Sequence, residues 1–248
     1  MKVLNHPLSE RKAEAILTAL PECRRETYLQ IARESGITTE VERLTAAQLY
    51  VWNGYLASVV DRLTGEVEVL LRNWLDKCLT EWNSHPDRGG SPNWIEYPEG
   101  VLGQIINPEG GTALKDRAHL GTVKGDPTHD DYVAGLTFGQ WLHILPKPHA
   151  HSEENDRLKL WGEALEPLLP DPSTDRVSFQ RNAKIAKDMR NRATHRRPLI
   201  KDLNEGLRSL NGVHKSCIEL AKAINPEIGA WIQKERWIPD AIKQNPLK

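Results

Sequence analysis

Apolar residues recur at steps of three and four along the stretch from Thr45 to Trp82, and this pattern limits the possible folds more than any other feature of the chain. Such spacing places the apolar side chains along one side of an α-helix. It predicts one long helix, or two helices bent near Gly65. We interpret the stripe as a surface that packs into a core, formed by Leu49, Trp52, Leu56, Val59, Leu63, Val67, Leu70, Trp74 and Cys78.

The remaining segments also follow a helical rather than a strand pattern, which predicts an all-α fold. Residues 83–127 are the exception, because they are dense in Gly, Pro, Asn and Asp. We expect them to form an irregular insertion with one short helix near Thr112–His119. Helices are predicted over residues 10–20, 22–34, 128–145, 152–169, 173–197, 199–223 and 226–235, with N-caps at Ser9, at Thr128 (paired with Asp131), at Ser152 and at Ser173 or Asp175.

These elements predict an N-terminal helical segment, residues 1–44, packed on a helical domain of residues 45–248 that carries the insertion. The three cysteines lie far apart, as is typical of reduced thiols in a cytoplasmic protein. Charged residues interrupt the N-terminus where a signal peptide would be apolar, and no apolar run approaches the ~20 residues of a membrane span. We therefore expect a cytoplasmic protein with no membrane partner.

Positive charge is concentrated near the C-terminal end of the predicted helix 173–197, in the sequence MRNRATHRRPL. The whole chain has a net charge of −1. Between Arg176 and Lys201, however, there are nine Lys or Arg residues and one acid, Asp188, which give +8 and leave −9 for the remainder. A local basic stretch of this kind is a candidate surface for a polyanion such as RNA.

A helical projection separates the two sides of this segment. The apolar residues Ile185, Ala186, Met189 and Ala193 share one side, and the polar residues Arg190, Asn191, Thr194 and His195 point away from it. Arg190 and His195 are five residues apart, which places them about 140° apart around the helix. A site that uses both side chains therefore needs a distorted helix end or a second element, and a second subunit related by a two-fold axis could supply that element.

Arginine and histidine together support one type of phosphate chemistry. The guanidinium group presents a planar set of donors to phosphate oxygens, and an imidazole accepts a proton from a hydroxyl group near neutral pH. In RNA, that hydroxyl is the 2′-OH beside the scissile phosphate. The residues favour internal attack of the 2′-oxygen on phosphorus over two-metal hydrolysis, which needs several acidic residues.

Several segments resemble one known family. RNRATHRRPL resembles the Arg–Asn–x–x–x–His signature of the HEPN-domain ribonucleases of the Abi-like (abortive infection) branch. Four further segments resemble elements of that family in the same order, so that the resemblance covers most of residues 45–234: LYVWNGYLA (49–57), EVEVLLRN (66–73), LTFGQWLHIL (136–145) and INPEIGAWI (224–232). The sequence departs from the family pattern at Thr194, where a small apolar residue is common, and at Arg196–Arg197, where His–Glu is common.

The resemblance implies a HEPN-type helical bundle, normally a homodimer, whose paired motifs cleave RNA without a metal or other cofactor and leave a 2′,3′-cyclic phosphate. It implies a role in phage defence or as a growth-arresting toxin, with an antitoxin of protein or RNA as a possible partner. Arg190 would stabilise the phosphate and His195 would act as the base. The supporting residues would be Asn191, Thr194, Glu68, Arg72 and Asn73, and we expect RNA to contact Arg181, Lys184, Lys187, Arg192, Arg196 and Arg197.

Other interpretations remain open. The chain could be a non-catalytic RNA- or nucleotide-binding HEPN module, or a dimerising protein whose basic surface binds an acidic partner. His149, His151 and Glu153 form a weak candidate for a metal site, since no Cys or Asp cluster accompanies them. We expect His143 to be a packed histidine and Cys78 to be an inert core residue.

Overall fold

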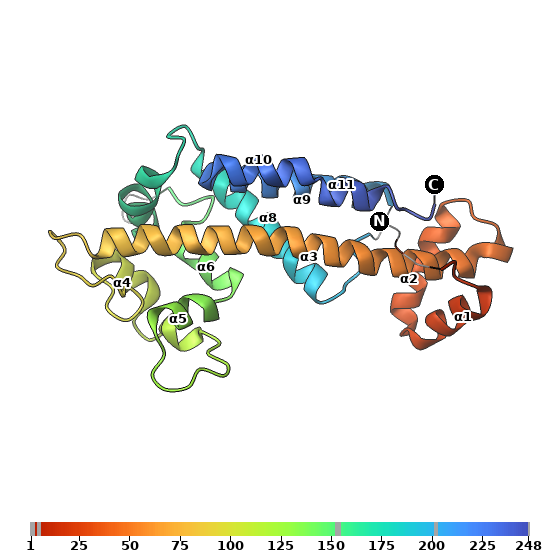
Figure 1. Ribbon diagram of the computed structural model, residues 1–248, viewed down its shortest axis with the longest axis horizontal. Helices are drawn as coiled ribbons and strands as arrows, with labels where there is room; N and C mark the ends of the chain where they lie inside the picture. The colour runs from red at the N-terminus through yellow and green to blue at the C-terminus, as the bar shows by residue number, and fades with distance from the viewer. Residues whose placement is uncertain (1–2, 4–5, 152–154, 201–202, 248) are drawn as a thin grey trace. The chain divides into compact units, whose positions relative to one another are not determined.

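The computed structural model describes residues 3, 6–151, 155–200 and 203–247 (Figure 1). Within these ranges the chain is built from helices and loops without any strand, so the all-α prediction is confirmed. The helices are α1 (Glu10–Ala19), α2 (Glu22–Glu34), α3 (Thr39–Asn83), α4 (Gly100–Ile106), α5 (His129–Gly135), α6 (Phe138–Ile144), α7 (Asp156–Leu160), α8 (Arg176–Thr194), α9 (Leu203–Ile224), α10 (Pro226–Glu235) and α11 (Trp237–Ile242), with shorter turns at Lys115–Arg117, Trp161–Leu165 and Glu166–Leu168.

The predicted stripe lies on α3, a single helix that continues through Gly65 (Figure 1). Most members of the stripe are buried, including Trp52, Leu56 and Leu63. Val59 and Leu70 are only half-buried, and the adjacent residues Val60 and Leu71 take the core positions. This shift is expected over a helix of 45 residues, because a strict repeat of three and four drifts around a helix with ~3.6 residues per turn.

The chain divides into two compact units. Unit 1 comprises residues 1–65, 188–217 and 232–248, and unit 2 comprises residues 66–187 and 218–231. Each of the four passages from one unit to the other falls inside a helix, namely α3, α8, α9 or α10. The interpretation of residues 1–44 as a separate segment remains a prediction.

In unit 1, charged pairs join α1 and α2 to the first turns of α3. Arg43 Nε donates to Glu14 at 2.6 Å, and Arg33 Nε donates to Glu42 at 2.9 Å. Further along α3, the buried Trp52 indole donates to the carbonyl of Ala241 in α11 at 2.9 Å. These contacts use both ends of the chain to cover the N-terminal half of α3.

Unit 2 has an aromatic core. The ring of Phe179 lies between those of Trp74 and Trp161, with centroid distances of 5.4 and 5.3 Å, and Trp94 contacts Trp141 edge to face at 6.0 Å. These contacts bring together the C-terminal half of α3, the insertion, α6 and α8.

The insertion is more ordered than the sequence predicts. The Asn83 amide accepts from Glu99 N–H at 2.8 Å and donates to the carbonyls of Ser91 and Tyr97, which holds the loop after α3 closed. Helix α4 was not predicted, because its surroundings are rich in Gly and Pro. The helix predicted near Thr112–His119 is only a 3₁₀ turn at Lys115–Arg117.

Two other helix predictions are wrong in detail. Residues 128–145 form α5 and α6 rather than one helix, because Leu136 is extended and Thr137 with Gln140 forms a new capping box. The predicted cap Ser152 lies outside the described residues, and Asn155 instead caps α7 by accepting from Arg157 and Leu158 N–H. The predicted caps at Ser9 and at Thr128–Asp131 are confirmed.

Candidate functional site

Helix α8 carries the predicted motif, and local chemistry sets both of its ends. Asp175 caps the start, since its carboxylate accepts from Val177 N–H at 3.3 Å and Ser178 N–H at 2.9 Å. At the other end, Arg196 N–H donates to Ala193 O at 2.8 Å and Arg197 N–H donates to Arg192 O at 3.0 Å. This pair of bonds is a Schellman motif, which ends the helix at Thr194, three residues before the predicted end.

The Schellman motif makes His195 the C-cap residue and places Arg196 in the left-handed region, with φ of 49°. A left-handed residue in this position is most often glycine. The chain therefore turns sharply immediately after His195, and the imidazole lies at an exposed corner rather than on the side of a longer helix.

The predicted orientation of the motif is confirmed. Ala186, Met189 and Ala193 are buried, whereas Asn191, Thr194 and His195 are exposed. Arg190 is half-buried. Of the two candidate catalytic residues, His195 is thus exposed just beyond the end of the helix, and Arg190 is partly exposed on it.

Residues of α3 in the same unit fix the turn that follows the motif. Thr194 Oγ1 donates to Asp61 at 2.8 Å, and the buried amide oxygen of Asn53 accepts from Leu199 N–H at 2.8 Å. Arg192 Nη2 donates to the carbonyl of Pro198 at 2.6 Å. Asp61 and Asn53 therefore position the segment that carries His195, and sequence reasoning did not assign this role to either residue.

Arg62 lies beside Asp61 on α3 and extends the cationic character of this surface. Its guanidinium group lies 4.4 Å from the ring centroid of Trp237, a cation–π contact. Arg196 and Arg197 are exposed, and Arg192 is half-buried. Unit 1 thus carries several arginines on the segment of His195 and on the part of α3 that holds Thr194 through Asp61.

The other predicted site residues belong to unit 2. Glu68 and Arg72 are half-buried on α3, and the exposed Asn73 accepts a long hydrogen bond from Arg72 Nε at 3.5 Å. On α8, Arg181 and Lys184 are exposed and Lys187 is half-buried. Their participation in one site with Arg190 and His195 remains a prediction.

A polar network in unit 2 contains a histidine that the sequence analysis did not single out. His129 Nε2 lies 2.8 Å from Asp76 Oδ1, and Nδ1 lies 3.1 Å from Asn93 Oδ1. The Trp94 indole also donates to Asp76 at 2.8 Å. Because every ring nitrogen of His129 faces an oxygen, the histidine links α3, the insertion and α5, and it has no nitrogen left for a substrate. The capping box at Thr128 was the only sequence signal at this position.

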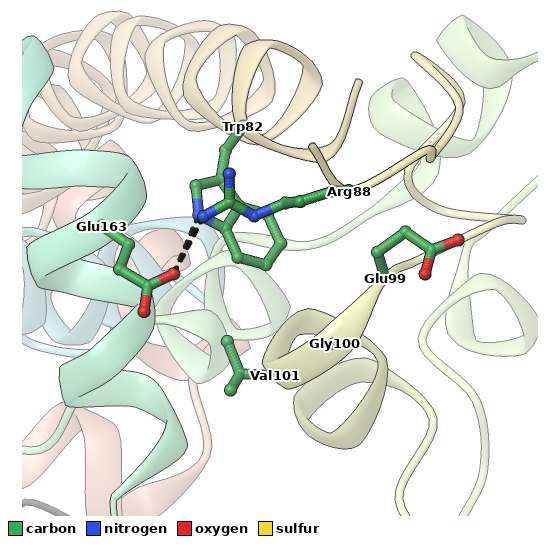
Figure 2. A pocket seen from close by; sticks show the side chains of 6 residues that line it. All are labelled: Trp82, Arg88, Glu99, Gly100, Val101 and Glu163. Atoms are coloured by element: carbon green, nitrogen blue, oxygen red, sulfur yellow. Dashed lines mark hydrogen bonds and ion pairs between the residues drawn. The ribbon is translucent and has the colours of Figure 1, made fainter. Parts of the chain in front are cut away.

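A cavity of about 330 Å³ beside Trp82 is lined by one base, Arg88, and two acids, Glu99 and Glu163 (Figure 2). Arg88 lies over the Trp82 ring at 4.3 Å and pairs with Glu163 at 3.1 Å. Glu163 also accepts from the Trp82 indole at 3.3 Å. The guanidinium group is therefore committed to the protein's own carboxylate, and this cavity is a poor candidate for an anion site.

Two of the three thiols are buried, and the suggested metal ligands are only partly described. Burial raises the pKa of the Cys78 and Cys217 thiols to about 12, so neither is a thiolate near neutral pH. Among the residues that the structure describes, no group of three His, Cys, Asp or Glu side chains is arranged to hold a metal ion. His149 and His151 are described, and Glu153 lies outside the described residues.

No helix in the described ranges is long and apolar enough to cross a bilayer. Comparison of the chain with protein-family models, curated protein sequences and solved structures finds no match. The function has to be inferred from the residues of the site themselves.

Proposed function

We propose that this chain is a metal-independent endoribonuclease of the HEPN type, in which Arg190 and His195 carry out the reaction. The observation that carries this proposal is the end of α8. An exposed imidazole lies at a fixed turn directly after the helix that carries Arg190, and Arg192, Arg196 and Arg197 lie within three residues of it along the chain. A surface of this composition suits an RNA phosphate and its neighbouring 2′-OH.

In the proposed reaction, His195 removes the proton of the 2′-OH. The 2′-oxygen then attacks phosphorus, the bond to the 5′-oxygen breaks, that oxygen takes up a proton from water as it leaves, and His195 releases its own proton to the solvent. The products are one RNA end with a 2′,3′-cyclic phosphate and one with a 5′-hydroxyl group. Arg190 stabilises the negative charge that develops on the phosphoryl oxygens. The proposed reaction needs no metal ion, because one side chain removes the proton of the 2′-OH and another stabilises the negative charge.

The active unit in this proposal is a homodimer. In an ideal helix Arg190 and His195 would lie about 140° apart, and α8 ends at Thr194, before His195. A two-fold axis near the end of α8 would place Arg190 of one copy near His195 of the other. The family resemblance also implies supporting roles for Glu68, Arg72 and Asn73 and RNA contacts for Arg181, Lys184 and Lys187.

The biological setting that fits this activity is phage defence or toxin-like growth arrest in the cytoplasm. A ribonuclease without a cofactor requirement is active as soon as it folds, so a cell that carries it needs a means of restraint. An antitoxin, either a protein or an RNA, would provide that restraint by covering the basic surface.

The test compares three purified proteins on end-labelled single-stranded RNA: wild type, His195→Ala and His151→Ala. His151 is also exposed, but it lies outside the motif and serves as the matched control. We expect His195→Ala to reduce the cleavage rate by about 10²–10⁴-fold, the usual contribution of a general base. We expect His151→Ala to cleave like wild type, and far-UV circular dichroism should show the same helix content in all three.

The non-catalytic RNA-binding module predicts a different result. In that case, none of the three proteins cleaves RNA, while wild type still binds it with an affinity that falls steeply with salt. Equal cleavage by wild type and His195→Ala would refute the proposed mechanism and point to another nuclease site or a contaminant.

A further inference from the structure

Unit 2 contains a second cavity, whose chemistry differs from that of the motif and of the cavity beside Trp82. Its volume is about 620 Å³, and it lies between α6, the loop at residues 145–149, Arg157 of α7 and the middle of α8. This volume lies within the range of small-molecule sites, about 300–1,000 Å³. Leu142, Leu145 and Pro146 form an apolar part of its wall.

The wall also contains a buried polar side chain, that of Gln180. Only 4% of the residue is exposed, and neither its amide nitrogen nor its amide oxygen has a hydrogen-bond partner among the described residues. A buried amide without partners destabilises a folded protein, so such groups are rare unless water or a ligand satisfies them. Gln180 lines the cavity, and after a rotation of its buried amide toward the cavity a bound molecule would supply both the missing donor and the missing acceptor.

The charge of the lining is positive. Lys147, Arg157, Lys184 and Lys187 all line the cavity, and no Asp or Glu does so among the described residues. Arg157 is held in place, because its Nε donates to the His143 carbonyl at 2.7 Å and its Nη2 lies 3.0 Å from His143 Nε2. His143 is exposed, so the prediction of a packed histidine is wrong, but desolvation by its neighbours, followed by the charges of Arg157, Arg117 and Lys147, lowers its pKa. The lining therefore favours an anion.

We propose that this cavity is a binding site for an organic phosphate of about the size of a mononucleotide. The flat ring of the ligand lies against Leu142 and Leu145, its phosphate lies among the cations, and a polar edge of the ring bonds to the Gln180 amide. This inference does not depend on the proposed ribonuclease activity, since Arg190 and His195 do not line the cavity; Lys184 and Lys187, which are also proposed RNA contacts, do line it and are therefore left unchanged in the variants below.

The experiment is isothermal titration calorimetry of the full chain with three phosphates that carry different rings: AMP, UMP and FMN. Adenosine and inorganic phosphate serve as half-ligands. We expect saturable binding of at least one of the three phosphates, and at least about tenfold weaker binding of both half-ligands, because each lacks either the charge or the ring.

Two variants assign the binding to this cavity. Gln180→Met keeps the shape of the side chain and removes the amide, so we expect about tenfold weaker phosphate binding together with a higher melting temperature of the ligand-free protein. The rise in melting temperature separates a ligand-binding role from a structural one. Lys147 is exposed, so Lys147→Glu should not disturb the fold. It tests the positive charge of the lining independently of Gln180 and should also weaken phosphate binding. Gln233→Met, an exposed glutamine of α10, is the control and should bind like wild type.

Absence of saturable binding for all three phosphates at millimolar concentration would overturn the proposal. Equal binding by Gln180→Met, Lys147→Glu and wild type would also overturn it, as would inorganic phosphate binding as tightly as the best organic phosphate. RNA cleavage measured in parallel keeps this result distinct from the proposed activity. Absence of phosphate binding in a protein that cleaves RNA would contradict only the proposal for the cavity. Phosphate binding in a protein that does not cleave RNA would contradict only the proposed ribonuclease activity.

Discussion

At the scale of single residues, Arg196 is the most unusual feature of the motif. Its φ of 49° is a conformation in which a Cβ atom approaches the backbone, and the Schellman motif at the end of α8 requires it. Arginine at this position lowers the stability of the folded protein relative to glycine, which has no Cβ atom. The chain retains a guanidinium group there, next to His195, which is consistent with a requirement for positive charge at the turn.

Arg196→Gly should therefore stabilise the protein by about 1 kcal/mol, because glycine adopts the left-handed conformation without steric cost. Urea denaturation followed by circular dichroism measures this change. Arg197→Gly is the control, since Arg197 has no positive φ and its substitution should leave stability unchanged or slightly lower. A loss of stability in Arg196→Gly would show that its side chain contributes more than its backbone conformation costs.

Sequence reasoning succeeded for residues whose role depends on near neighbours. Asp175 and Thr128 are helix caps because a short polar side chain reaches the next few N–H groups, whatever the rest of the fold. Arg196 escaped prediction because arginine seldom occupies a left-handed C′ position. Gln180 and Asp76 escaped it because their roles depend on residues brought close by tertiary packing, which spacing along the chain does not reveal.

At the scale of elements, Gly229 sets how closely α10 approaches the end of α9. A Cβ atom at this position would lie 2.6 Å from the backbone nitrogen and 2.7 Å from the Cα of Lys222. Backbone atoms cannot move aside as a side chain can. The glycine in the segment INPEIGAWI thus has a packing reason that is independent of any family resemblance.

Gly229→Ala should destabilise the protein by about 1–3 kcal/mol through this overpacking. Gly212→Ala is the matched control, because Gly212 also lies in a helix, is exposed, and has open space at its Cβ position. Alanine has a higher helix propensity than glycine, so Gly212→Ala should be more stable than wild type by about 0.5–1 kcal/mol. A lower melting temperature for Gly229→Ala and a higher one for Gly212→Ala would support this account, and equal changes in melting temperature would contradict it.

The hydrogen bond between Asn53 of α3 and the segment after α8 leads to a second prediction at this scale. Asn53→Ala removes the acceptor of a buried N–H group, that of Leu199, and should cost about 1–3 kcal/mol. The turn around His195 should then loosen, which hydrogen exchange at residues 195–199 would detect. Asn211→Ala, an exposed asparagine of α9, should change stability by less than about 0.5 kcal/mol. Unchanged exchange in Asn53→Ala would rule out the positioning role of Asn53.

Element boundaries were the weakest part of the sequence interpretation, and α5 and α6 show why. Residues 128–145 keep a helical pattern throughout, so the break at Leu136 left no trace in the apolar spacing. The signal was the Thr137–Gln140 pair, a capping box inside an apparent helix. The long stripe of α3 was predicted well, because burial along one helix side repeats over many turns.

At the scale of the whole molecule, His214 couples folding to pH. It is buried on α9, and burial, with a smaller effect of the positive charge of Arg236, lowers its pKa from the ordinary value near 6.5. The unfolded chain therefore binds more protons than the folded chain between the two pKa values. The contribution of His214 is fully present above a pH of about 6.5 and is lost as the pH falls toward the lowered pKa.

Wild type should thus lose unfolding free energy between about pH 7.5 and about pH 5.5, and His214→Leu should lose less over the same interval. Urea titrations at several pH values measure the slope. His151→Ala should keep the wild-type slope, because His151 is exposed. His143, whose pKa is also lowered, accounts for part of the slope that remains. Identical slopes in wild type and His214→Leu would exclude the coupling.

The central claim is that Arg190 and His195 cleave RNA by attack of its own 2′-oxygen, and the chemistry of the new RNA ends tests this claim most directly. The measurement is mass spectrometry of a defined single-stranded RNA after incubation with the wild-type protein in excess EDTA. We predict fragments that end in a 2′,3′-cyclic phosphate and begin with a 5′-hydroxyl group. Intact RNA, or fragments with 3′-hydroxyl and 5′-phosphate ends, would contradict the account.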